Sequence, residues 1–489
     1  MTKLPTRFRQ VYDQVYKKNN LFGIDQKLKP NPLLSKDKRK NSVAVAGGML
    51  GDEGKGRVTD ELTAYFLRNK NHNKVIHYRD NGGANAGHTV EVGEVRIALH
   101  QLSSGVLQPG CVVVAGKEMV LHPEDLVLEI NHVLKATGKK SLPATLVIDE
   151  MAFLCLDTHR AFEAVLKMHS RGSKGATGRG ISPAYADVIY RHPLRMRDLV
   201  SRNWKKKLEQ HYQLYQNWVK GFGYELAEIE VPRLEGGNIK LGTLKQMTTR
   251  LERSRQVLKP YVKNVYQLIE THWPKKTPFV FEKAQALGLD RRWGVYPDVT
   301  ASNCGFDGLL SSTEGLVNPD EIAVKCAVIK ATYSSSVGAR QLPTAMTGPL
   351  AEKIRQDANE YGATTGRPRD IAYLDLPMMS YLFEVGQVDY LAVTHLDISY
   401  PDTPIKVCLN YQIDNQVVNY RPDQNFLDQV EPIYFELPGW NGQEAAEAQT
   451  IQDLPQQAQQ YLAFISQALK TKLLLATTGP KRKQTIRWW

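Results

Sequence analysis

The sequence predicts an α/β fold with a large, mainly parallel central sheet, flanking helices, a P-loop-like nucleotide site and a helical excursion. Short apolar runs alternate with segments of helical spacing, the pattern of parallel strands joined by helices. A glycine-rich loop follows the first run, as in many phosphate-binding folds. The predicted strands are residues 42–46, 74–78, 111–115, 145–148, 278–281, 323–330 and 390–394.

The domain organisation follows from length and local composition. A chain of 489 residues, 42% hydrophobic and 23% charged, can bury a large core. Residues 1–41 predict a basic N-terminal extension, because a short amphipathic stretch precedes a segment rich in Lys and Pro. We expect the main domain to span 42–489. Within it, basic helical patterns over about 203–275 predict the excursion beside the sheet.

Charge and apolar content limit the class of protein. The net charge of +12 suits a polyanionic partner or nucleotide substrates. A basic tail is usually a solvated flank, so a nucleic-acid partner is the minority interpretation. Since no apolar run reaches the roughly 18–20 residues of a membrane helix, we expect no membrane association and a cytoplasmic location. The scattered cysteines predict reduced core thiols: Cys111, Cys155, Cys304, Cys326 and Cys408.

The loop after the first predicted strand has the composition of a phosphate site. Its glycines let backbone N–H groups approach phosphates, and Lys55 adds a positive charge at a helix start. The Walker A pattern is imperfect because Gly56 stands where a Ser or Thr would ligate Mg²⁺. Asp52, within the loop, could hold a metal ion or remove a proton. The alternative is a tight turn between a strand and a helix.

A second loop, residues 79–89, places His88 among small residues after another predicted strand. A single histidine in such a loop is more often structural than catalytic. The two loops together, GDEGKG at 51–56 and GGANAGHT at 82–89, resemble the signature pair of adenylosuccinate synthetases. Further motifs follow in the family's order: HQLSSG at 100–105, GRGISPAY at 178–185, EKAQ at 282–285, GVYPDVTASN at 294–303, GATTGRPR at 362–369, THLD at 394–397 and TGP at 478–480.

The resemblance covers about 43–487 and implies a mechanism. Asp52 would take the proton from N1 of IMP, so that O6 attacks the γ-phosphate of GTP. His88 would stabilise charge on the transferred phosphoryl group. The amine of L-aspartate would then displace phosphate at C6, giving adenylosuccinate, as in purine biosynthesis. Phosphorylation makes physical sense, because the oxygen at C6 is otherwise a poor leaving group.

The resemblance also implies ligand sets. One Mg²⁺ per active site would be held by Asp52 and the carbonyl of Gly87. The family is homodimeric, and Arg191 would reach the partner's site. GTP would be bound by Gly51, Glu53, Gly54, Lys55, Gly56, Arg57, Thr89, Arg369, His395, Asp397, Thr477 and Gly479. IMP would be bound by Asn85, Thr177, Arg191, Gln285, Thr300 and Arg367. L-Aspartate would be bound by Thr364, Thr365, Arg367 and Arg369.

Several positions depart from the family pattern. His395 replaces a lysine, Lys283 a glycine and Leu50 a tryptophan. Over 335–345, Ser336 and Ala345 stand in place of an arginine and a glutamate, and Arg340 is a candidate replacement for the lost charge. A histidine at 395 can still stack on guanine.

Two alternatives to IMP ligation remain open from the sequence. The first is a paralogous C–N ligase that uses another purine nucleotide, such as (d)GMP, or another amine donor. The second is a non-catalytic nucleotide-binding regulator. The retained Asp52, Lys55 and His88 favour a catalytic protein.

Overall fold

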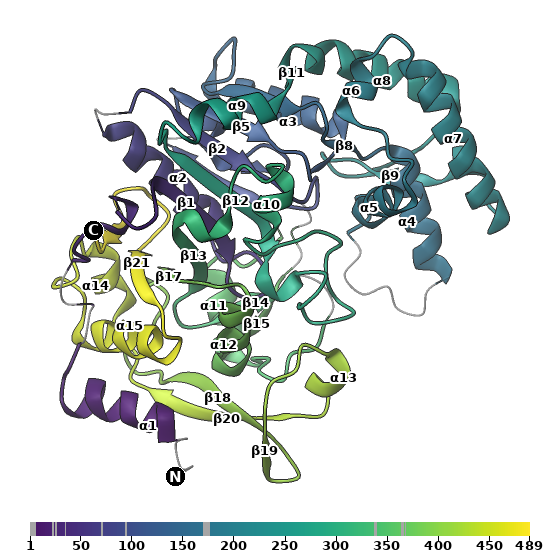
Figure 1. Cartoon of the computed structure of the whole chain (residues 1–489). Helices are drawn as coiled ribbons and strands as arrows, with labels where there is room; N and C mark the ends of the chain where they lie inside the picture. Colours follow the sequence, from purple (N-terminus) through teal and green to yellow (C-terminus); the bar gives the residue numbers. More distant parts are fainter. Residues whose placement is uncertain are drawn as a thin grey trace.

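A ten-stranded sheet forms the centre of the chain, whose computed structural model describes residues 6–21, 24, 27–34, 36–69, 72–92, 95–169, 177–336, 340–362, 366 and 368–489 (Figure 1). All neighbouring strands are parallel except the last pair, so the predicted mainly parallel sheet is confirmed. The strand order is β11 (Val262–Lys263), β7 (Thr145–Asp149), β5 (Cys111–Ala115), β2 (Val75–Arg79), β12 (Phe279–Ala286), β1 (Arg39–Gly47), β13 (Ile322–Lys330), β17 (Tyr390–Thr394), β21 (Lys472–Thr477) and β22 (Thr485–Arg487).

Each predicted strand is present, with ends that shift by a few residues. The strands read as continuous apolar runs because helices cover both faces of the sheet, so side chains on either face are buried. Three sheet strands were not predicted: β11, β21 and β22. Strands β11 and β22 are short edge strands, and the apolar run of β21 lies directly after a helix that hides its periodicity.

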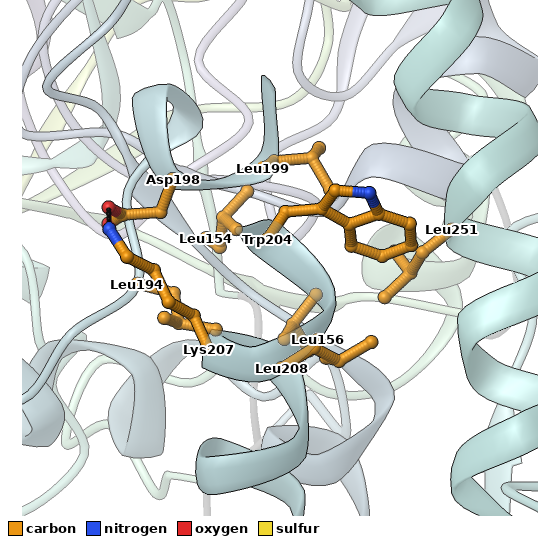
Figure 2. A pocket seen from close by; sticks show the side chains of 9 residues that line it. All are labelled: Leu154, Leu156, Leu194, Asp198, Leu199, Trp204, Lys207, Leu208 and Leu251. Atoms are coloured by element: carbon orange, nitrogen blue, oxygen red, sulfur yellow. Dashed lines mark hydrogen bonds and ion pairs between the residues drawn. The ribbon is translucent and has the colours of Figure 1, made fainter. Parts of the chain in front are cut away.

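The excursion contains α7 (Trp204–Gly221), α8 (Leu244–Leu258) and α9 (Val265–His272), as the basic helical pattern predicts. A small hairpin, β9 (Glu230–Pro232) with β10 (Asn238–Lys240), interrupts the helices. The excursion packs on α3 (Pro123–Thr137) and α4 (Asp157–His169). Figure 2 shows Trp204 and Leu251 in an apolar cluster between these helices. The cavity that they line has a volume of about 10 Å³, which is too small for a ligand.

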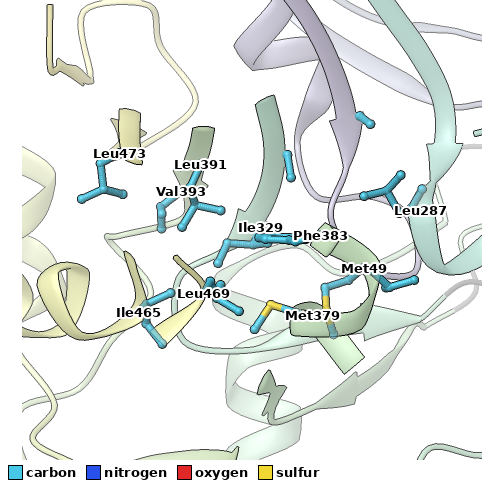
Figure 3. Close-up of a cluster of buried hydrophobic side chains, with 14 of the residues drawn as sticks. Met49, Leu287, Ile329, Met379, Phe383, Leu391, Val393, Ile465, Leu469 and Leu473 are labelled. Carbon is cyan, nitrogen blue, oxygen red and sulfur yellow. The ribbon is translucent and has the colours of Figure 1, made fainter. Parts of the chain in front are cut away.

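A second, smaller sheet lies beside the carboxyl-terminal half of the main sheet. It comprises β16 (Leu374–Asp375), β18 (Ile405–Ile413), β19 (Gln416–Val418) and β20 (Glu431–Leu437). Helix α12 (Leu376–Val385) connects it to the core, where Phe383 and Met379 meet Ile329 of β13 (Figure 3). This packing places α12 directly under the first glycine loop, because a Cβ built at Gly48 would lie 3.1 Å from the Phe383 ring.

The N-terminal segment packs on the C-terminal part of the chain. Helix α1 (Thr6–Tyr12) lies against α15 (Gln456–Ala468), and Val15 is fully buried. The indole of Trp488 is also fully buried and donates from Nε1 to the carbonyl of Ile24 at 2.9 Å. The prediction of a solvated N-terminal segment is therefore correct for exposed cations such as Lys17. It is wrong for the apolar side chains of this segment that are buried.

Two further expectations concern membrane segments and cysteines. Within the described ranges, every helix is too short or too polar to cross a bilayer. All five cysteines are buried free thiols, as predicted.

Candidate active site

The first glycine loop turns sharply between β1 and α2 (Lys55–Arg68). Gly51 and Gly54 have φ angles of 104° and 89°, in the left-handed region that favours glycine. Asp52 also has a positive φ, 57°, which is unusual for a residue with a side chain. A Cβ at Gly56 would lie 3.2 Å from the Cβ of His88, so the two predicted catalytic residues belong to loops in direct contact.

Glu53 organises the loop from within. Its buried carboxylate accepts from the N–H of Gly51 at 2.8 Å and of Met49 at 3.2 Å, and its other oxygen lies 2.9 Å from the Lys55 ammonium. Thr394, at the end of β17, donates its hydroxyl to the Glu53 carbonyl at 2.8 Å. The N–H groups of Met49 and Gly51 and the Lys55 ammonium thus converge on one buried carboxylate, which fixes the shape of the loop.

Asp52 is the first of several charged residues that are linked in series by ion pairs. Its Oδ2 lies 2.9 Å from Nε of Arg369, whose Nη1 donates to Glu360 at 2.8 Å. The other Glu360 oxygen accepts from Lys330 and from the Tyr333 hydroxyl. Burial opposes ionisation of Glu360, but Lys330 and the neighbouring cations lower its pKa to about 2. The sequence does not single out Lys330, Tyr333 or Glu360, because a single lysine, tyrosine or glutamate outside a motif carries no signal.

His88 begins β3 (His88–Val92) and is 5% exposed. Its Nδ1 meets a carboxylate oxygen of Glu282, on β12. The other oxygen of Glu282 lies 2.6 Å from Nε2 of His77, on β2. Burial lowers the pKa of His88, and Glu282 offsets only part of this shift. Neither Glu282 nor His77 was proposed from sequence, although Glu282 opens the EKAQ motif.

Three of the predicted IMP-binding residues lie at or after the carboxyl ends of β2 and β12: Asn85, Gln285 and Thr300. Gln285 has a φ of 58°, its Oε1 accepts from Ser302 at 3.1 Å, and its buried Nε2 has no partner among the described residues. Asn85 accepts from the N–H of Gly83 at 3.1 Å. Thr300 lies in the loop after β12, while Thr177 is exposed. An unpaired buried donor such as Gln285 Nε2 suits a substrate oxygen.

The predicted guanine-recognition segment is held by two distant parts of the chain. Within it, His395 has a φ of 60°, and one carboxylate oxygen of Asp397 is buried without a partner in the described structure. The Leu396 carbonyl accepts from Trp440 Nε1 at 2.8 Å, and the Leu396 N–H donates to Thr477 at 3.1 Å. Burial and nearby Lys330 lower the pKa of His395.

Other predicted site residues are placed differently. The guanidinium of Arg57 is buried and donates to the Lys481 carbonyl and the Thr485 hydroxyl, both at 2.6 Å. Gly479, in the same C-terminal segment, has a φ of 153°. Arg191 is exposed after α5 (Ile181–Tyr190). Gly87 and Thr89, which flank His88, are both exposed. The residues that lie outside the described part of the chain are Thr364, Thr365 and Arg367.

Two of the departures from the family pattern, Lys283 and Arg340, have local partners. Lys283 forms a fully buried ion pair with Asp80 of the second loop. Arg340, 4% exposed, donates to the backbone carbonyl of Asp298 at 2.8 Å. The hydroxyl of Ser336 is buried without a partner among the described atoms.

Comparison with known proteins agrees with the motif order. The family model described as adenylosuccinate synthetase matches residues 44–486. The chain is 34% identical to the adenylosuccinate synthetase of Clostridium botulinum strain Alaska E43 over 451 residues, which cover 91% of this chain and 99% of that protein. It is 32% identical to that of Trichlorobacter lovleyi over 452 residues, or 91% and 98% of the two chains.

Solved structures show the same architecture. Fully ligated adenylosuccinate synthetase from Plasmodium falciparum matches with a TM-score of 0.79 and 27% identity, over 91% of this chain and 99% of that chain. Cyanophage S-2L succinoaminodeoxyadenylate synthetase, bound to dGMP and dATP, matches with a TM-score of 0.54 and 15% identity, over 92% and 95%. At that identity, the second likeness concerns the fold alone.

Proposed function

Because the chain belongs to the adenylosuccinate synthetase family, we propose that it is a C–N ligase that joins L-aspartate to IMP with GTP, giving adenylosuccinate, GDP and phosphate. The observation that carries this proposal is the contact of the two glycine loops. Gly56 of the first loop approaches His88 of the second, and Lys55 is near enough for its charge to act on the His88 ring. Such a group of a base, a cation and an imidazole fits phosphoryl transfer.

In this mechanism, Asp52 accepts the N1 proton of IMP as O6 attacks the γ-phosphate. Lys55 and the loop N–H groups bind the phosphates, and His88 stabilises charge on the transferred group. The unpaired Nε2 of Gln285 is a candidate donor to the nucleotide. The amine of aspartate then displaces phosphate from C6. Asp52, His88 and Gln285 lie at or after the carboxyl ends of the parallel strands β1, β2 and β12, where ligands of α/β folds bind.

The donors fit one Mg²⁺ ion. Asp52 offers a partly exposed carboxylate, and Gly87 an exposed backbone carbonyl. A Cβ built at Gly87 would meet nothing within 4 Å, so there is space beside this peptide group. Oxygen donors are the ligands that Mg²⁺ prefers, and the ion would neutralise phosphoryl charge.

Aspartate recognition is assigned to the loop that contains Arg369. A guanidinium can pair with a carboxylate through two parallel hydrogen bonds, which an ammonium cannot do. Asp397, with an unpaired buried oxygen, is assigned to the guanine of GTP, whose N1–H and 2-amino groups are donors.

A homodimer would complete the IMP site through Arg191. The residues just before it, Ile189 and Tyr190, are 74% and 64% exposed. Two adjacent apolar side chains on one helix end suit coverage by a second copy. We assign the enzyme to cytoplasmic purine biosynthesis on the basis of the family.

Product formation with parallel nucleotides tests the proposal. Purified protein is mixed with GTP, Mg²⁺, L-aspartate and either IMP, GMP, dGMP or XMP, and succinyl-nucleotide formation is measured, with Asp52→Asn as the inactive control. Turnover with IMP alone supports the proposal. Turnover only with another nucleotide would assign the changes at Ser336 and Arg340 to substrate choice. No turnover with any nucleotide would contradict ligation of aspartate.

A further inference from the structure

His77 is a polar residue in the interior of the main sheet. Strand β2 is buried along its whole length, between β5 and β12, and His77 pairs in register with Val113 and Val280. The side chain of His77 is 0% exposed. A polar group in such a position is costly unless its hydrogen bonds are satisfied, so its partners define what it does.

Both ring nitrogens of His77 have a partner. Nδ1 lies 3.0 Å from the hydroxyl of Thr63, which itself donates to the Thr59 carbonyl at 2.7 Å. A neutral imidazole carries one N–H, so the tautomer with its proton on Nε2 donates to Glu282, and its Nδ1 then faces the Thr63 hydroxyl. Gly105 packs against the ring, since a Cβ at Gly105 would lie 2.5 Å from Nδ1. The ring is thus fixed in one orientation, with Nε2 directed at Glu282.

Glu282 is the group between His77 and His88. Each of its oxygens meets one imidazole, and Ser104 donates to one oxygen from its N–H and to the other from its hydroxyl, both at 2.8 Å. Burial opposes ionisation, but the two histidines hold the pKa of Glu282 well below its usual value. Since the carboxylate is ionised, a proton lies on the path between each oxygen and its imidazole nitrogen.

We propose that His77 is a positioning residue for the ligase reaction: acting through Glu282, it fixes the His88 ring with Nδ1 inward, so that Nε2 faces the transferred phosphoryl group. The inference rests on the proposed role of His88. Without His77, one oxygen of Glu282 keeps only the Ser104 N–H as a donor, so the carboxylate is held less firmly against His88. Misplacement of a catalytic group by a fraction of an ångström lowers the rate of the chemical step.

The test compares three His77 variants in the full-length enzyme. His77→Leu removes the donor, His77→Gln carries an amide donor that reaches Glu282, and His77→Asn carries the same amide one methylene shorter. We expect kcat to fall about tenfold or more in the Leu and Asn variants, to be largely restored in the Gln variant, and KM for IMP, GTP and aspartate to change less than about threefold. Equal kcat in the Gln and Asn variants would overturn the inference. This comparison remains valid if His77→Leu does not fold.

A double-mutant cycle separates positioning from structural damage. If His77 acts through His88, then His77→Asn costs no further kcat in a His88→Asn background. Fully additive losses would overturn the inference while the role of His88 stands. Full kcat in His88→Asn alone would instead remove the proposed role of His88, and the inference with it. Thermal unfolding of each variant reports stability separately from kcat.

Discussion

The Nε of Arg369 lies 2.9 Å from Oδ2 of Asp52. The predicted base and a predicted ligand of aspartate therefore form an ion pair, although 317 positions separate them in sequence (369 minus 52). Arg369 also binds Glu360, whose charge is balanced by Lys330. The guanidinium is thus oriented by one buried carboxylate while it faces the predicted base, and this relationship leads to two of the predictions below.

Asp52→Asn is expected to lower kcat by about 10²-fold or more, the scale of a lost general base. The amide keeps the size of the side chain but cannot accept the N1 proton. Steady-state kinetics of adenylosuccinate formation measures the effect. A variant with unchanged kcat and only a raised KM would show that Asp52 binds substrate without acting as the base.

Arg369→Lys is expected to raise KM for aspartate about tenfold or more, because an ammonium cannot form the two parallel bonds of a guanidinium. The positive charge beside Asp52 and Glu360 is kept, so unfolding should change little. Initial rates at varied aspartate concentration test this prediction, with KM for IMP as the internal control. An unchanged KM for aspartate would place aspartate recognition elsewhere.

The ion pair between Lys283 and Asp80 is expected to behave as a unit. Both side chains are buried, at 0% and 1% exposure, so Asp80→Asn leaves an unpaired ammonium and should cost about 3–5 kcal/mol of unfolding free energy. The double variant Asp80→Asn with Lys283→Met should cost less than Asp80→Asn alone. Urea unfolding of the parent protein, Asp80→Asn, Lys283→Met and the double variant gives the coupling, and additive costs would mean that the pair does not interact.

Histidine protonation should destabilise the protein in acid. Burial, with the adjacent charge of His159, lowers the pKa of His211 to about 3, although Asp187 partly offsets this shift. Since the unfolded histidine has a pKa near 6.5, the unfolded chain binds more protons between about pH 3 and 6.5, and stability is lost as pH falls through this window.

His211→Gln removes this titration while it keeps a hydrogen-bonding group near Thr158, which lies 2.7 Å from His211 Nε2. The fall in melting temperature between pH 7 and pH 5 should be smaller in the variant than in the parent protein. The two proteins differ only at this residue, so the difference between the two falls reports on His211. An identical fall in both would show that His211 does not contribute.

Trp488→Ala is expected to cost about 3–5 kcal/mol, the range for large buried aromatic residues. Trp488→Phe, which keeps most of the volume but loses the bond to Ile24, should cost about 1 kcal/mol. Because Trp488 holds the N-terminal segment, proteolysis should cut before residue 39 faster in the Ala variant. Equal proteolysis of both variants would mean that this segment is held by α15 alone.

The sequence by itself determined the fold class, the position of the first glycine loop and the family. The apolar runs located seven sheet strands, the glycine spacing located the sharp loop between β1 and α2, and the ordered motifs indicated the family that comparison confirmed. These signals are local, because strand burial, turn geometry and loop composition depend on residues that are close together in the sequence. The same local logic predicted the helical excursion.

Only the tertiary structure decided which side chains meet. His77 reads as one polar residue in an apolar strand until β2 and β12 become neighbours and place it 2.6 Å from Glu282. The guanidinium of Arg57 belongs to the phosphate-loop motif, yet it donates to the C-terminal segment. Strand order and register bring together residues more than two hundred positions apart. Patterns among neighbouring residues do not predict contacts at that separation.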